Sequence, residues 1–299
     1  MFEIKNCPVC GSPSMQRIGE AEDYLVSNET FILTQCDNCS FVFTNPRPEE
    51  KTILKYYKSD DYISHTDRTR GLFERVYILV RAYMLKRKYK IIRELTPKEE
   101  KITLLDFGCG TGEFLLYLQK HDLISFGYEP NETAREKARK KGISVLSNRN
   151  DLITHQFKSK FNVITLWHVL EHIHDLKSQI RLFHDALSLN GLIIVAVPEY
   201  RSYDAKFYGF KWAAWDVPRH LNHFEETTIE RLFEQNGFKK EKKFPLIFDS
   251  FYVSMLTEKT RKTGFTGTLR AASIGLLSNL KAYSGSYPYS SQIYVFRKI

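Results

Sequence analysis

The chain has 299 residues, of which 42% are hydrophobic and 26% charged, the composition of an ordinary globular protein. No apolar run reaches the roughly 18 residues of a membrane span, and the N-terminus lacks a signal-peptide layout, so we expect a cytoplasmic protein. The net charge is +9, and we interpret the basic residues as lying on solvated faces of helices and strands. The alternative is that they attract an anionic partner: a nucleotide-linked sugar, a phospholipid surface or nucleic acid.

Four of the five cysteines form two C-x-x-C pairs near the N-terminus: Cys7, Cys10, Cys36 and Cys39. Two such pairs on tight turns have the spacing of a tetrahedral zinc site with four thiolate ligands and no open position. Two redox dithiols are the alternative, but redox motifs usually occur singly beside a βαβ unit. We expect a structural zinc ion, because about 40 residues bury too little core to fold without a staple.

The first hundred residues divide into two predicted parts. Residues 1–45 are predicted to form a zinc ribbon, with β-like runs at 31–34 and 41–44 on either side of the second cysteine pair. The linker Asn45–Pro48 follows. Residues 49–98 have helical periodicity and are predicted to be a helical linker that covers the ligand site of the next domain.

Residues 99–299 alternate between predicted strands and helices, which indicates an α/β domain with a parallel sheet and crossover helices. The expected strands are 102–106, 125–129, 143–146, 161–166, 192–197, 238–248 and 292–297, and the expected helices are 113–121, 132–141, 175–189 and 228–236. Two inserts interrupt the pattern, at 199–224 and 249–288. The second is predicted to be a lid over the substrate pocket, with a membrane-surface helix as the weaker alternative.

A glycine turn follows the first strand of this domain. The strand ends in Asp106, and glycines follow at Gly108, Gly110 and Gly112 before a helical pattern begins. Glu113 stands where a dinucleotide fingerprint needs glycine, and the Gly-Lys-Ser/Thr of a P-loop is absent. A carboxylate at this strand end would repel a pyrophosphate and attract a cationic sulfonium, so Asp106 is expected under the turn, accepting its backbone N–H groups.

The second strand also ends in an acidic residue, Glu129. Its distance from the turn is close to that of a ribose-binding acid in a βαβ unit, and a carboxylate can accept hydrogen bonds from both ribose hydroxyls. The alternative is a surface glutamate at a strand end. The glycine turn and the two acidic strand ends together predict a site for a sulfonium nucleoside.

These motifs resemble the class I S-adenosylmethionine-dependent methyltransferases. Residues 104–115 resemble motif I, Gly127–Pro130 the acidic strand end, and 161–172, with its Val-Leu-Glu-His sequence, the fourth strand and its continuation. Asn162 departs from the aspartate usual in the family. The resemblance implies a Rossmann-like seven-stranded sheet with a reversed final hairpin, and S-adenosylmethionine as cofactor.

The resemblance also implies further cofactor contacts. It places Pro130 beside Glu129, and Asn150 and Asp151 in the loop that contacts adenine. An N-terminal zinc ribbon before this domain resembles a bacterial group, some of whose relatives act on sugars, antibiotics or quinones.

Candidate catalytic residues follow the fourth strand. Trp167 is predicted either to cover the adenine or to pack in the core, with the two evenly balanced, and His168 is a candidate base. Similar quinone O-methyltransferases have a metal site in this stretch. Because histidine stands at 168 where they carry glutamate, a functional metal near Glu171 and His172 is the minority hypothesis.

The insert after the fifth strand supplies His220 and His223 as further candidate bases. The structural alternative is that His223 caps the next helix while Asp216 and Arg219 form an ion pair. Tyr62 and His65 precede the sheet in the sequence, and their segment is a candidate to fold over the cofactor.

Together these features predict methyl transfer to a small molecule (a sugar, polysaccharide precursor or secondary-metabolite hydroxyl) with a histidine general base. The alternative is an RNA methyltransferase that holds nucleic acid on the ribbon and basic face. The ribbon has few basic residues, Lys5 and Arg17 with Arg47 just beyond, and no Asn-Pro-Pro-Tyr motif follows the fourth strand, so nucleic acid is the less favoured partner. Acceptor, methylated atom and oligomeric state are not fixed by the sequence.

Overall fold

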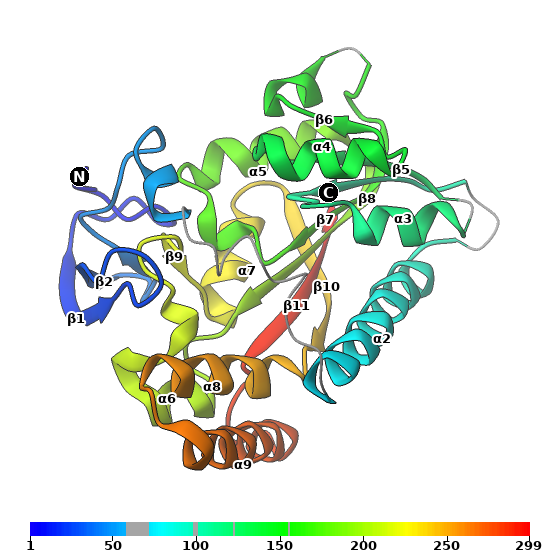
Figure 1. The fold of residues 1–299 in the computed structure, drawn as a ribbon. Coiled ribbons are helices and arrows are strands. Elements are labelled where there is room, and N and C mark those ends of the chain that lie inside the picture. Colours follow the sequence, from blue (N-terminus) through cyan, green and yellow to red (C-terminus); the bar gives the residue numbers. More distant parts are fainter. Residues whose placement is uncertain (58–71, 98–100, 122, 155) are drawn as a thin grey trace.

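The computed structural model describes residues 1–57, 72–97, 101–121, 123–154 and 156–299, arranged around two sheets (Figure 1). Tyr62 and His65 lie outside these described residues.

The larger sheet has seven strands in the order β10-β11-β8-β7-β4-β5-β6. Their bounds are β4 Thr103–Phe107, β5 Ile124–Tyr128, β6 Val145–Leu146, β7 Phe161–Trp167, β8 Leu187–Pro198, β10 Phe238–Pro245 and β11 Ser291–Lys298. The strands from β8 to β6 pair in parallel, whereas β11 is antiparallel to both β8 and β10. The predicted Rossmann-like sheet with a reversed final hairpin is confirmed.

Helices cover both faces of this sheet because buried side chains alternate along its strands. Leu105 packs with the apolar residues of α5 (Leu176–Ala186) and α7 (Glu226–Glu234) on one face. Its neighbour Leu104 packs on the other face, with α2 (Leu72–Leu95), α3 (Glu113–Gln119) and α4 (Glu132–Lys140). The two inserts follow β8 and β10, so both begin at the carboxyl edge of the sheet.

The smaller sheet joins the N-terminal residues to the first insert. Its order is β1-β2-β3-β9, with β1 Met15–Glu22, β2 Thr30–Cys36, β3 Val42–Thr44 and β9 Asn222–His223. The ribbon region therefore takes its fourth strand from the insert, where Val42 pairs with His223. Strand β1 was not among the predicted runs, because its alternation of apolar and polar residues is weak.

The two inserts form a helical layer below the sheet in Figure 1. The first contains α6 (Tyr203–Tyr208), two 3₁₀ turns, η4 (Gly209–Lys211) and η5 (Ala213–Trp215), and β9; the second contains α8 (Asp249–Thr260) and α9 (Gly264–Tyr283). Buried Asp204 joins them, accepting hydrogen bonds from Trp212 Nε1 at 2.8 Å and Ser278 Oγ at 2.7 Å. Among the described helices, none is long and apolar enough to cross a membrane.

Candidate functional site

The acidic strand ends and the glycine turn meet where the strand order reverses, since β4 pairs with β5 on one side and β7 on the other. Open α/β sheets bind their ligands at this carboxyl edge. Glu129 braces the turn: its Oε2 accepts the Gly110 N–H at 2.8 Å and its Oε1 the Asn131 N–H at 2.9 Å.

Asp106 plays a different part from the one predicted. It pairs in register with Thr165 of β7, and its Oδ1 accepts the Thr165 hydroxyl at 2.6 Å. The expectation that Asp106 accepts the N–H groups of the turn is wrong for Gly110, because Glu129 accepts that bond. Burial raises the pKa of Asp106 to about 6, against the opposing effects of Thr165 and Lys88.

Two glycines show why the turn needs this residue type. Gly112 has φ of 79°, and a Cβ there would lie 2.3 Å from Ile143. Gly110 has φ of 54°, and a Cβ there would meet no atom of the described residues within 4 Å, so its backbone is open on that side. Within the part of the chain that the structure describes, buried Trp167 Nε1 at the same edge has no hydrogen-bond partner. An open backbone and an unsatisfied donor fit a ligand rather than a sealed core.

Helix α2 places a cation over this edge. The Lys88 ammonium lies 4.3 Å from the centre of the Trp167 ring and 5.5 Å from that of Phe114. Burial lowers the pKa of Lys88 to about 8, although the Asp106 and Asp249 carboxylates oppose this. No motif marked Lys88 or Asp249 in the sequence, because each acquires its chemistry only from side chains of other elements.

His168 lies directly after β7 with a positive φ of 57°, a strained backbone of the kind found at functional sites. Its Nδ1 is 3.4 Å from Glu171 Oε1 and its Nε2 is 3.1 Å from Asp249 Oδ2. Burial opposes protonation, but these two carboxylates outweigh it and raise the pKa of His168 to about 10. Its side chain is 40% exposed, more than that of either partner.

A second cluster lies beside it, made of Glu171, His172 and His220, whose ligand atoms are all within 4.8 Å of one another. Glu171 is 1% exposed, and among the described residues its carboxylate makes no hydrogen bond beyond the 3.4 Å ion pair of Oε1 with His168 Nδ1. His172 Nδ1 donates to the Arg219 carbonyl at 2.9 Å, and His220 Nδ1 to the Ala214 carbonyl at 2.8 Å. These carbonyls place a proton on each Nδ1, so in the neutral rings Nε2 is the atom left to bind a metal, although Asp216 Oδ2 lies 3.8 Å from His220 Nε2.

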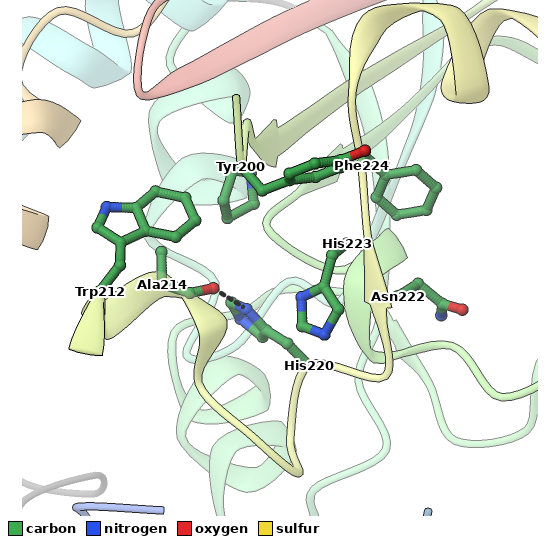
Figure 2. Close-up of a pocket in the computed structure, with 8 residues that line it drawn as sticks. Tyr200, Trp212, Ala214, His220, Asn222, His223 and Phe224 are labelled. Atoms are coloured by element: carbon green, nitrogen blue, oxygen red, sulfur yellow. Dashed lines mark hydrogen bonds between the residues drawn. The ribbon is translucent and has the colours of Figure 1, made fainter. Parts of the chain in front are cut away.

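His223 lies in the sheet that joins the insert to the ribbon region. The Thr44 hydroxyl donates to the His220 carbonyl at 2.9 Å, so its oxygen accepts from His223 Nε2 at 3.1 Å. Burial lowers the pKa of His223 well below its usual value. His220 and His223 line one pocket (Figure 2). Its volume is about 10 Å³, so it holds one water at most. A larger cavity, about 230 Å³, lies by Asn162 and Gly191 at the opposite edge of the sheet, away from this chemistry.

The ion pair between Asp216 and Arg219, which was the structural alternative for this insert, is present, and it extends to a third residue. Arg219 is fully buried, and its Nη2 lies 2.7 Å from Asp216 Oδ1 and 2.9 Å from Asp23 Oδ1. Its Nη1 donates to the Tyr56 carbonyl at 2.9 Å. One guanidinium thus holds together the insert, the loop between β1 and β2, and η1 (Ile53–Tyr57).

The four N-terminal cysteines converge as the spacing predicts. The sulfurs of Cys7 and Cys39, and those of Cys10 and Cys36, are 3.5 Å apart, and all four lie within 4.8 Å of one another. Every cysteine is a free thiol. Four thiolates around zinc at about 2.3 Å stand about 3.8 Å apart, so the arrangement fits the ion. The fifth cysteine, Cys109, faces Gly127 and is buried.

The remaining predicted cofactor residues lie at the same edge of the sheet. Pro130 follows β5, and its carbonyl accepts from Arg135 at 3.0 Å. Asn150 is exposed and Asp151 half-buried in η2 (Arg149–Ile153), just after β6. The fold therefore brings the loop residues to the side of the sheet that carries Glu129.

Comparisons with known proteins agree with this geometry. A family model described as a methyltransferase domain matches residues 80–243. A Haemophilus influenzae protein described as uncharacterized is 30% identical over 160 residues, which are 49% of this chain and 61% of that protein. The chain thus spans about three fifths of the length of this curated relative.

Two solved structures share the fold. A Thermotoga maritima methyltransferase described as a possible histamine N-methyltransferase has 18% identity and a TM-score of 0.50, with 76% of this chain and 94% of that chain covered. The magnesium protoporphyrin IX methyltransferase of Synechocystis, solved with bound S-adenosylmethionine, has 14% identity and a TM-score of 0.50, with 86% and 100% covered.

Proposed function

Because the chain belongs to the methyltransferase-domain family, we propose that it transfers a methyl group from S-adenosylmethionine to a small-molecule hydroxyl. The observation that carries this proposal is the open backbone at Gly110, braced by the Glu129 carboxylate at the switch point of the sheet. Each Glu129 oxygen accepts one backbone N–H and keeps a lone pair for a ribose hydroxyl. Pro130, Asn150 and Asp151 would complete the nucleoside side.

The amino-acid end of the cofactor would face Asp106. A buried carboxylate is a favourable neighbour for a cationic sulfonium, and Lys88 already places a cation beside it. We infer that the cofactor replaces the Lys88 ammonium near Asp106 and Trp167. When bound, S-adenosylmethionine supplies an activated methyl group for an in-line displacement, and the protein supplies position and a proton acceptor.

His168 is the histidine best placed to accept that proton. In the structure Asp249 forms an ion pair with His168 Nε2. Together with Glu171 it raises the pKa of the imidazole to about 10, which keeps the ring protonated at neutral pH. An acceptor hydroxyl that displaces Asp249 would remove one of the two carboxylates that stabilise the imidazolium, so the Nε2 proton would leave with the Asp249 carboxylate and free the Nε2 lone pair while Glu171 still faces Nδ1. The acceptor oxygen would then gain the methyl group as its proton passes to Nε2. The predicted catalytic roles of His220 and His223 stay predictions, and their buried contacts favour positioning roles.

An RNA acceptor remains the alternative, and one residue weakens it. Arg47, counted as a basic residue beside the ribbon, is 5% exposed and donates to the His174 carbonyl at 2.6 Å. A buried guanidinium cannot neutralise a phosphate. Methyl incorporation into RNA from S-adenosylmethionine, with salt-sensitive RNA binding, would overturn the small-molecule proposal.

The catalytic proposal predicts that His168→Gln lowers kcat by roughly 10²- to 10⁴-fold, the usual contribution of a general base, and leaves S-adenosylmethionine affinity unchanged. The assay is labelled-methyl transfer to fractionated small molecules of a cell extract, with cofactor affinity measured by calorimetry. His223→Gln is the matched variant, expected to lose stability while the folded fraction retains its turnover. Full turnover by His168→Gln would remove His168 from the mechanism.

We propose that the four cysteines hold one structural zinc ion. The purified protein is expected to contain one zinc per chain, and Cys36→Ser to contain none. Because β2 and β3 carry the second knuckle and β3 pairs with β9, metal loss should also loosen the insert, seen as faster hydrogen exchange at residues 220–224.

Cys109→Ser is the control for this experiment, since Cys109 lies outside the cluster and should leave zinc content unchanged. Zinc-free protein with four reactive thiols would contradict the proposal. A second equivalent that survives Cys36→Ser but not Glu171→Gln would assign a metal to the Glu171, His172 and His220 cluster.

A further inference from the structure

Helix α9 exposes most of its large apolar side chains to solvent, whereas an ordinary surface helix buries them. The residues it buries against its neighbours are mostly small, Gly267, Ala271, Gly275 and Ser278, with Ile274 as the large one. A Cβ at Gly275 would lie 2.9 Å from Phe251 Cα, so α8 and α9 approach at backbone distance. Such a face packs closely with one large apolar side chain, Ile274, whereas surface helices normally turn their whole apolar stripe inward.

The outward face of α9 carries an apolar stripe: Phe265, Leu269, Leu276, Leu280 and Tyr283. At 3.6 residues per turn these five positions fall within about 60° of one another, so they form one continuous line along the helix. All five are more than half exposed, up to 86% at Tyr283. Figure 1 shows α9 as the outermost element of its layer, beyond α8.

The net charge around this stripe is positive. Residues 258–283 contain five Lys and Arg (Lys259, Arg261, Lys262, Arg270 and Lys281) and a single acidic residue, Glu258, which pairs with Arg261 and Arg270. Arg261 and Lys262 lie in the turn that leads into α9, and Lys281 in its last turn. The stripe therefore has cationic residues at both ends, and the Lys281 ammonium also lies 4.8 Å from the centre of the Tyr203 ring.

We propose that α9 binds the surface of an anionic membrane, lying in the interface with its stripe in the acyl boundary and its basic ends on the headgroups. A second copy of this chain fits less well. A two-fold contact would place each stripe on itself, with the basic residues of one copy near those of the other. Anionic lipid satisfies both the apolar stripe and the cationic ends, and α9 need not span the bilayer.

The test is co-sedimentation of the full chain with phosphatidylcholine vesicles, with and without added phosphatidylglycerol. We expect binding to the phosphatidylglycerol vesicles, weakened by salt. Leu269→Gln with Leu276→Gln should reduce that binding at least tenfold, since each leucine moved out of water is worth roughly tenfold. Arg261→Gln with Lys262→Gln should reduce it about tenfold or more on anionic vesicles only.

Leu54→Gln with Leu189→Gln is the matched control, because both leucines are exposed, at 64% and 80%, but lie outside α9. Circular dichroism and S-adenosylmethionine binding check that each variant is folded. Two results would overturn the inference: wild-type protein that stays in the supernatant at low salt, or a dimer that Leu269→Gln with Leu276→Gln converts to monomer. Vesicle binding is measured without cofactor, so its outcome is independent of the proposed reaction.

Discussion

Replacing Arg219 by methionine is expected to lower the free energy of unfolding by about 3–5 kcal/mol, because it leaves buried carboxylates without their cation. Asp23 is fully buried, and Asp216 lies beside it in the same pocket. The Tyr56 carbonyl loses a hydrogen bond as well. Urea unfolding followed by tryptophan fluorescence measures the change, since Trp215 lies in the same insert.

Arg17→Met is the control for Arg219→Met. The Arg17 side chain is 58% exposed and pairs only with Glu20 on the surface of β1, so its loss should cost no more than about 1 kcal/mol. Adding Asp216→Asn to Arg219→Met should restore part of the stability, because the hydrogen bonds to the Asp216 carboxylate from described residues come from Arg219, whereas Asp23 also accepts the N–H groups of Leu25, Val26 and Ser27. Equal losses in the two arginine variants would show that Arg219 does not hold together the insert, the loop between β1 and β2, and η1.

Glu129→Gln is expected to weaken S-adenosylmethionine binding by about 100-fold or more. Two hydrogen bonds from ribose to a charged acceptor are worth roughly 1.5–3 kcal/mol each. The amide also turns one NH₂ group toward a backbone N–H of Gly110 or Asn131, where the carboxylate accepts both. Isothermal titration calorimetry with S-adenosylmethionine measures the loss.

Glu136→Gln on α4 is the matched control, because it makes the same change at an exposed glutamate of the following helix. It should bind the cofactor as the wild type does. If Glu129→Gln also binds normally, Glu129 only braces the turn and the ribose contact lies elsewhere.

The sequence by itself determined the sheet, the glycine turn and the cysteine cluster. Strands such as β4 and β7 were predicted to within one residue, since buried strands and amphipathic helices have local periods of their own. The convergence of the four cysteines followed from spacing alone, because each C-x-x-C pair is a local turn. Even the acidic strand ends were found, since parallel strands bring their carboxyl ends to one edge.

Only the tertiary structure decided what the histidines contact. His223 pairs with Thr44 across 179 residues of sequence, and Arg219 reaches Asp23 across 196. Lys88 on α2 and Asp249 on α8 also reach the site from distant parts of the sequence. A side chain's pKa and role depend on neighbours that no local pattern specifies, because burial and Coulomb interactions act through space and not along the chain.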